Sequence, residues 1–122
     1  MGFPNLKYFT LEEFDSPDYK GSGINMDKDF LNMLDNARDI AGISFKITSG
    51  YRTKEHNKKV GGVKNSSHLI GFAADIAVSN NQERGIILSA LIKAKFKRVG
   101  IAKSFLHCDT DPNKPNSFWL YS

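Results

Sequence analysis

The sequence predicts a single α+β domain over residues 1–122, in which a central, mainly antiparallel β-sheet is flanked by helices. Two segments carry apolar residues at three- and four-residue spacing, which is typical of amphipathic helices. Short segments rich in β-branched and aromatic residues lie between and after them, which is typical of strands. A chain of 122 residues suffices for one hydrophobic core but is short for two.

The first half of the chain predicts a capped turn, a long helix and a strand. Thr10 and Glu13 have the spacing of a capping box, so a short helical turn is expected there. Apolar residues recur with helical periodicity over residues 27–41, and Gly42 is suited to end that helix. Apolar and polar residues alternate over residues 43–49, which predicts a half-buried strand.

The second half begins with a polar, lysine-rich stretch, residues 53–65, which we interpret as a loop with a helical turn near residues 55–60. A strand is expected over residues 73–78, and Asn80 with Glu83 opens a helix over about residues 82–95. The residues of this helix expected to face inward are Ile86, Ile87, Ala90, Leu91 and Ala94. Further strands are expected at residues 99–102, 105–109 and 118–121.

Net charge, cysteine content and the length of apolar runs limit the class of protein and the kind of partner. The net charge of +4 and the pI near 9.2 favour a polyanionic partner, either nucleic acid or an acidic wall polymer, although a solvated lysine face is an equal alternative. The lone cysteine, Cys108, excludes an internal disulfide framework. No apolar segment suited to a signal peptide follows Met1, and no run approaches the length of a membrane span. We therefore expect synthesis in the cytoplasm, no membrane insertion and a monomer.

The chemistry of the chain centres on residues 66–75, which contain His68 and Asp75. Both are metal-ligand types, and His107 on a later strand is a third. An aspartate within an apolar strand is costly to bury unless a metal or another cation neutralises it. A catalytic zinc needs about three such ligands and one open position for water. Taken alone, a histidine and an aspartate seven residues apart are a weak signal that favours a structural pair over a metal site.

The pattern of residues 66–75, Ser-x-His-x-x-Gly-x-Ala-x-Asp, resembles the signature of the zinc D-Ala-D-Ala carboxypeptidase family, which includes bacterial wall enzymes and phage endolysins. Two flanking segments agree with it. Residues 47–53 (ITSGYRT) resemble that family's Ser-Gly-Tyr-Arg strand end, and residues 105–109 (FLHCD) resemble its His-x-Asp segment. The resemblance spans residues 9–109.

The resemblance implies that His68, Asp75 and His107 bind zinc. It further implies that Arg52 binds the substrate carbonyl and stabilises the oxyanion, a role that suits a permanently charged guanidinium. Ser66 would hydrogen-bond near the ligand loop or to the substrate. A bound zinc would polarise the peptide carbonyl and lower the pKa of its water toward about 7.

The group that accepts the proton from this water is less clearly indicated. Many members of the family place an acid three residues before the last histidine ligand, but that position is Ser104 here. Asp109 lies two residues after His107 and shares its face of the strand, so it is the expected general base. The alternative is that Asp109 orients His107 as a hydrogen-bond acceptor. Glu55 is the reserve candidate for the base.

Three other features have plainer interpretations. His56 lies outside the signature spacing and is expected to be structural or to face substrate. Cys108 alternates away from His107 and is expected to be a core residue rather than a nucleophile. The aromatic residues at 118–121 are expected to pack in the core and at an edge, with an aromatic wall of the substrate groove as the alternative.

These observations predict a zinc metallopeptidase that acts on the stem peptides of peptidoglycan, as a D,D-carboxypeptidase or as an endopeptidase. A phage or prophage lysis role is the expected setting. The rival hypothesis is a non-catalytic, metal-stabilised module that binds the cell wall, and its motivation is Ser104. A nucleic-acid-binding domain is not expected, because charge alone supports it.

Overall fold

A five-stranded sheet in the order β1-β2-β4-β3-β5 forms the centre of the protein, seen in a computed structural model that describes residues 5–121. The strands are β1 (Ile47–Ser49), β2 (Ala73–Ala77), β3 (Arg98–Ile101), β4 (Phe105–Asp109) and β5 (Ser117–Leu120). Three of the pairings are antiparallel, whereas β3 and β5 are parallel. The predicted α+β class is confirmed, but the sheet is mixed, so the expected mainly antiparallel arrangement needs this correction.

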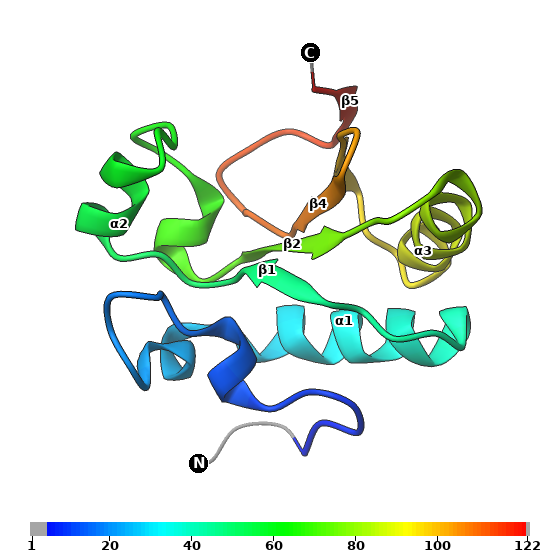
Figure 1. Ribbon diagram of the computed structural model, residues 1–122, viewed down its shortest axis with the longest axis horizontal. Helices are drawn as coiled ribbons and strands as arrows, with labels where there is room; N and C mark the ends of the chain where they lie inside the picture. Colours follow the sequence, from blue (N-terminus) through cyan, green and yellow to red (C-terminus); the bar gives the residue numbers. More distant parts are fainter. Residues whose placement is uncertain (1–4, 122) are drawn as a thin grey trace.

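Three α-helices accompany the sheet in the described part of the chain: α1 (Lys28–Ala41), α2 (Lys54–Lys59) and α3 (Asn81–Lys93). Figure 1 shows α1 along one side of the sheet, with α2 and α3 near its opposite ends. Single 3-10 turns occur at Leu11–Phe14, Ser22–Asn25 and Ser67–Ile70. The predicted domain also includes residues 1–4 and 122, which lie outside the described residues.

The hydrophobic core lies on one face of the sheet, against α1 and α3. Ile76 of β2 and Leu106 of β4 are fully buried in it, together with Phe30 and Leu34 of α1 and Leu91 of α3. Because side chains alternate along a strand, the residues between these positions point to the other face. Asp75 and His107 are such residues, so the core packing of β2 and β4 also determines where the candidate ligands lie.

The ends of α1 match the sequence prediction. The Asp27 side chain accepts a hydrogen bond from the backbone N–H of Phe30 at 2.9 Å, which caps the first turn. Gly42 ends the helix in the left-handed conformation, with φ of 70°, which glycine adopts without steric cost.

Other boundaries differ from the prediction. Of the expected strand 43–49 only residues 47–49 form regular strand, although the Lys46 carbonyl still accepts from Ala77 of β2 and Phe45 is buried as the alternation required. The helical turn expected near residues 55–60 is confirmed as the short helix α2, which begins one residue earlier, at Lys54, and ends at Lys59. Ile86 was wrongly placed in the core and is 43% exposed, because the buried stripe of α3 passes through Ile87 at a spacing of three and four residues.

Candidate metal centre

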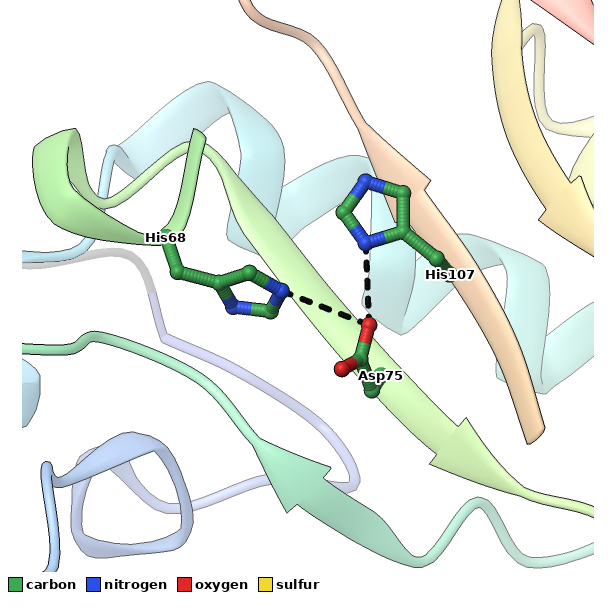
Figure 2. A group of neighbouring side chains, drawn as sticks. All are labelled: His68, Asp75 and His107. Atoms are coloured by element: carbon green, nitrogen blue, oxygen red, sulfur yellow. Dashed lines mark hydrogen bonds and ion pairs between the residues drawn. The ribbon is translucent and has the colours of Figure 1, made fainter. Parts of the chain in front are cut away.

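Three buried residues from three separate elements meet on the face of the sheet opposite the core (Figure 2). His68 comes from the turn Ser67–Ile70, Asp75 from β2 and His107 from β4. Asp75 and His107 lie directly opposite each other in the antiparallel register of β2 and β4. One nitrogen or oxygen from each of the three residues lies within 4.8 Å of the other two. The three predicted ligands are therefore brought together.

The turn that carries His68 is fixed at both of its ends. The Ser66 side chain accepts a hydrogen bond from the His68 backbone N–H at 3.2 Å and so caps the turn. Gly71 ends it with φ of 79°, and a Cβ at this position would lie 2.1 Å from the carbonyl oxygen of Asn25. Only glycine satisfies both the conformation and the close approach.

The backbone of Gly50 determines which nitrogen of His68 is free. Nδ1 of His68 lies 2.7 Å from the Gly50 carbonyl oxygen, which can only accept a hydrogen bond. Nδ1 therefore carries a proton, and Nε2, which faces Oδ1 of Asp75 at 3.3 Å, is the nitrogen left to bind a metal.

His107 is oriented by Asp109 in the corresponding way. Its Nε2 lies 2.7 Å from Oδ2 of Asp109. That carboxylate also accepts hydrogen bonds from Arg98 Nε at 2.7 Å and from the Asp111 backbone N–H at 3.1 Å. An ionised carboxylate accepts only, so Nε2 of His107 donates to Asp109, while Nδ1 faces Asp75, 2.9 Å away, and is the nitrogen that would bind a metal.

This donor set fits a bound cation. Two imidazole nitrogens and a carboxylate oxygen face one another, and either protons or a metal cation must lie among them to hold them together. For a tetrahedral zinc with ligand bonds of about 2.0–2.1 Å, neighbouring ligand atoms are about 3.3 Å apart. The distances of 3.3 and 2.9 Å from Asp75 to the two histidines are close to this value. Two histidines and one carboxylate are also among the ligand sets found for catalytic zinc.

The electrostatics of the centre support the same conclusion. Burial alone would raise the pKa of Asp75, but hydrogen bonding with His107 and His68 outweighs it and holds the pKa well below its usual range. Burial would lower the pKa of His107, yet the carboxylates of Asp109 and Asp75 on either side raise it above its ordinary value. The surroundings of His107 therefore attract positive charge.

Arg52 lies next to the ligands and is held by three side chains. Its guanidinium lies 3.5 Å from Oδ2 of Asp75 and donates hydrogen bonds to Ser49 at 3.0 Å and Asn57 at 3.1 Å. Asn57 is buried and donates from Nδ2 to the Val63 carbonyl at 2.8 Å. Sequence reasoning missed this positioning role of Asn57, since an asparagine in a lysine-rich polar stretch has no distinctive pattern.

A cavity of about 360 Å³ adjoins the centre. Its lining residues are Tyr51, Arg52, Lys54, Lys64, Asn65, Ser66, Leu69, Ile70, Asp111 and Asn113. None of the three candidate ligands lines it, so Arg52, which contacts Asp75, connects the cavity with the centre. The two residues expected to contact substrate, Arg52 and Ser66, thus share one cavity.

Asp111 is the acidic residue in that lining, and sequence reasoning did not single it out. Its carboxylate accepts a hydrogen bond from Ser67 Oγ at 2.7 Å and lies 3.6 Å from the Lys114 ammonium. The alternation along β4, continued from His107 through Asp109, places residue 111 on the same face. That alternation is the signal that could have found it.

Several other predicted residues lie away from the ligands. Glu55 and His56 lie on α2 and line a different cavity, together with Pro17, Asp18 and Lys59. Ser104 is exposed in the turn between β3 and β4. Cys108 is fully buried in the core, and burial raises its pKa well above the ordinary value, which is unsuited to a nucleophile.

Trp119 of β5 lies beside the centre. Its ring centroid is 5.6 Å from that of His107, and the Arg98 guanidinium lies 4.9 Å from the indole centroid. Gly100 pairs with both His107 and Trp119, and a Cβ there would lie 2.7 Å from the indole and 2.6 Å from the Tyr121 ring. Glycine at position 100 therefore lets the indole approach His107, and the aromatic residues of β5 lie on the edge strand of the sheet, as the expected edge packing requires.

An α+β domain with this His-Asp-His centre and an adjacent arginine has the features of a metal-dependent hydrolase. Comparison with protein families matches residues 7–109 to the family described as Peptidase M15. The chain therefore belongs to the M15 peptidase family, which confirms the resemblance found in the sequence. No curated protein matches the chain. Family membership supports a metallopeptidase and implies a substrate related to peptidoglycan.

Proposed function

We propose that this protein is a zinc-dependent peptidase that hydrolyses peptide bonds in the stem peptides of peptidoglycan, as a D,D-carboxypeptidase or as an endopeptidase. The observation that carries the proposal is the convergence of His68, Asp75 and His107, with one nitrogen of each imidazole facing the carboxylate. The adjoining cavity with Arg52 and Ser66 supplies a place for the substrate.

His68, Asp75 and His107 would hold the zinc. When bound, zinc supplies a Lewis acid and a water whose pKa is lowered toward about 7. Arg52 binds the carbonyl oxygen of the scissile bond and stabilises the negative charge that develops on it. Its contacts with Asp75, Ser49 and Asn57 hold the guanidinium in place before substrate arrives.

Ser66 contributes a second contact to substrate. Its oxygen accepts a hydrogen bond from the His68 backbone, so the hydroxyl proton is available to a substrate carbonyl or carboxylate in the same cavity.

For Asp109 we infer that orienting His107 is its main role. The two nitrogens of an imidazole point in diverging directions, so a carboxylate bound at Nε2 lies away from a metal held at Nδ1. The Asp109 side chain is also fully buried and accepts from Arg98. Its predicted role as general base, with Glu55 in reserve, stays a prediction, and Asp111 joins the candidates because it lines the cavity with Arg52.

Rate measurements on zinc-loaded variants separate these roles. A general base replaced by its amide lowers kcat while zinc content is retained. A positioning residue replaced in the same way first lowers the affinity for zinc. We expect Asp109→Asn to show the second behaviour and Glu55→Gln to show neither.

We further propose that the protein acts on the cell wall in a phage or prophage lysis setting, as a monomer. The net charge of +4 supports attraction to acidic wall polymers. Within residues 5–121 no helix is long and apolar enough to cross a membrane.

The test is mass analysis of muropeptides after digestion of purified peptidoglycan, which reports activity and bond identity together. Native protein is compared with His68→Ala and with His56→Ala, which removes a histidine outside the centre. We expect new muropeptides from the native chain and from His56→Ala, and none from His68→Ala. Equal product from all three proteins contradicts the proposal.

The rival, a non-catalytic module stabilised by metal, is motivated by Ser104 at the position where related enzymes often have an acid. It predicts that native, zinc-loaded protein sediments with peptidoglycan while the muropeptide profile stays unchanged. Zinc-dependent appearance of any new muropeptide excludes it.

A further inference from the structure

We propose that Lys54 and Lys64 form a carboxylate-binding subsite beside the metal centre. This subsite selects stem peptides that carry a free carboxylate on a branch near the scissile bond. The inference rests on the proposed function, because it names the part of the wall peptide that this cavity recognises.

The two lysines stand where two cavities adjoin. Both line the 360 Å³ cavity that contains Arg52 and Ser66. Both also line a second cavity of about 330 Å³, together with Asn57, Lys58, Gly62 and Leu69. A substrate that reaches Arg52 through the first cavity therefore passes these ammonium groups.

The charge lining these cavities is positive and unbalanced. Asp111 is the acidic residue in the first lining, and the second lining contains none. Asp111 is already engaged by Ser67 and Lys114. Within residues 5–121 no carboxylate lies within 4 Å of the ammonium groups of Lys54, Lys58 or Lys64. A ligand carboxylate thus meets cations that the protein itself leaves unneutralised.

The backbone positions of both lysines are fixed relative to Arg52. Lys54 is the first residue of α2, and its neighbour Thr53 caps that helix by accepting from the His56 N–H at 3.1 Å. The segment that leads to Lys64 is bound back to α2, because the Gly62 N–H donates to the Asn57 carbonyl at 2.9 Å. Asn57 also holds Val63, as described above. The two backbone segments that carry these lysines are therefore held to each other through Asn57.

The chemistry of the lining favours a carboxylate on a short aliphatic branch. Leu69 lines both cavities, and Tyr51 and Ile70 add apolar surface to the first. Methylene groups of a peptide can pack on these side chains while the terminal carboxylate meets Lys54 and Lys64. The α-carboxylate of a γ-linked glutamate in the stem peptide has this form.

The experiment compares two peptides that differ in one group. The first is L-Ala-γ-D-Glu-L-Lys-D-Ala-D-Ala, and the second is the same peptide with the glutamate α-carboxyl amidated. KM and kcat are measured for zinc-loaded native protein and for the Lys54→Gln/Lys64→Gln double variant. Lys59→Gln is the matched control, since it removes a lysine from the same helix but from a different cavity.

We expect the KM of the native protein to be about tenfold lower for the acidic peptide than for the amidated peptide. Each of the two partly exposed charge contacts should lower KM by about threefold. The double variant should lose this preference with kcat on the amidated peptide unchanged, and Lys59→Gln should keep it. High salt should weaken the preference of the native protein. A double variant that retains the native preference, or a control that loses as much, overturns the inference.

Failure of the proposed function is distinguishable from failure of this inference. If zinc-loaded native protein cleaves neither peptide, the function is wrong for these substrates, and both peptides survive the incubation. The ratio of their equilibrium Kd values, measured by calorimetry on the same proteins, then replaces the ratio of KM values. A tenfold ratio that disappears in the double variant supports the subsite, and equal Kd values overturn it.

Discussion

Replacing Asp109 with asparagine should reverse the tautomer of His107. The carboxylate accepts from three donors, with Oδ2 facing Nε2 of His107 and Oδ1 facing Arg98 and the Asp111 N–H. An asparagine offers only one oxygen, and Arg98 with the Asp111 backbone will retain it as two donors against one. The amide NH₂ then faces His107 and donates to Nε2. A neutral imidazole then keeps its proton on Nδ1, the nitrogen that faces Asp75 and would otherwise bind the metal.

The expected magnitude follows from the role of such outer hydrogen bonds. Loss of the acceptor behind a ligating histidine typically weakens metal binding about 10–100-fold, which is about 1.4–2.8 kcal/mol. We expect the zinc Kd of Asp109→Asn to rise within this range, because the proton on Nδ1 must be displaced before the ion binds.

Competition with a coloured zinc chelator measures the Kd, and long-range ¹⁵N–¹H NMR spectra of the imidazole identify the tautomer directly. Asp39→Asn is the matched control, since it removes an exposed carboxylate that contacts Lys7 and Tyr8 at a distance from the centre. A folded Asp109→Asn protein whose zinc Kd stays within twofold of native, or whose His107 remains protonated at Nε2, refutes the reasoning.

Three further predictions concern packing and the metal. Gly100→Val places a side chain 2.6–2.8 Å from the rings of Trp119 and Tyr121, and should lower the free energy of unfolding by about 1–3 kcal/mol, measured with urea; a loss below about 0.5 kcal/mol contradicts the packing described. Asn57→Ala removes one of the two donors to the Val63 carbonyl, which keeps the Ser66 N–H, and one of the three contacts of Arg52, so we expect a loss of about 1–3 kcal/mol for the two hydrogen bonds together with a lower kcat/KM; unchanged values for both would contradict its positioning role. Zinc at 100 times its Kd should stabilise the native state by about 2.7 kcal/mol, and a chelator should return Tm to the metal-free value. A Tm that does not change with zinc concentration contradicts preferential binding of zinc to the native state.

The sequence could predict that the three candidate ligands lie together because the position of each depends on a local pattern. The alternation of β2 and β4 assigns Asp75 and His107 to the face opposite Ile76 and Leu106, and the antiparallel register then places them side by side. His68 is carried by a turn whose serine cap and final glycine are both visible in the sequence. Contacts between residues that are close in the sequence, or that lie opposite each other on two paired strands, can be predicted from the alternation of side chains and from turn signals.

The remaining features depend on contacts that periodicity does not encode. Alternation at residues 117–120 predicts a strand but not which strand it pairs with. After β4 ends at Asp109, the chain passes β3, and β5 then pairs with the outer side of β3 in the parallel direction. Arg52 donates a single side-chain hydrogen bond to Asn57, and Asp111 accepts one from Ser67. Such pairs are determined by the assembled fold, so sequence patterns alone did not reveal them.

The position of Trp119 gives the protein a spectroscopic probe of its own metal content. It is the chain's single tryptophan, and its ring centroid is 5.6 Å from that of His107. At such a separation a paramagnetic or coloured ion such as Co²⁺ or Cu²⁺ at the centre should quench the indole fluorescence. Spectroscopically silent Zn²⁺ should displace the quenching ion and restore the fluorescence. Loading, exchange and loss of the ion can therefore be followed in real time on the unlabelled protein.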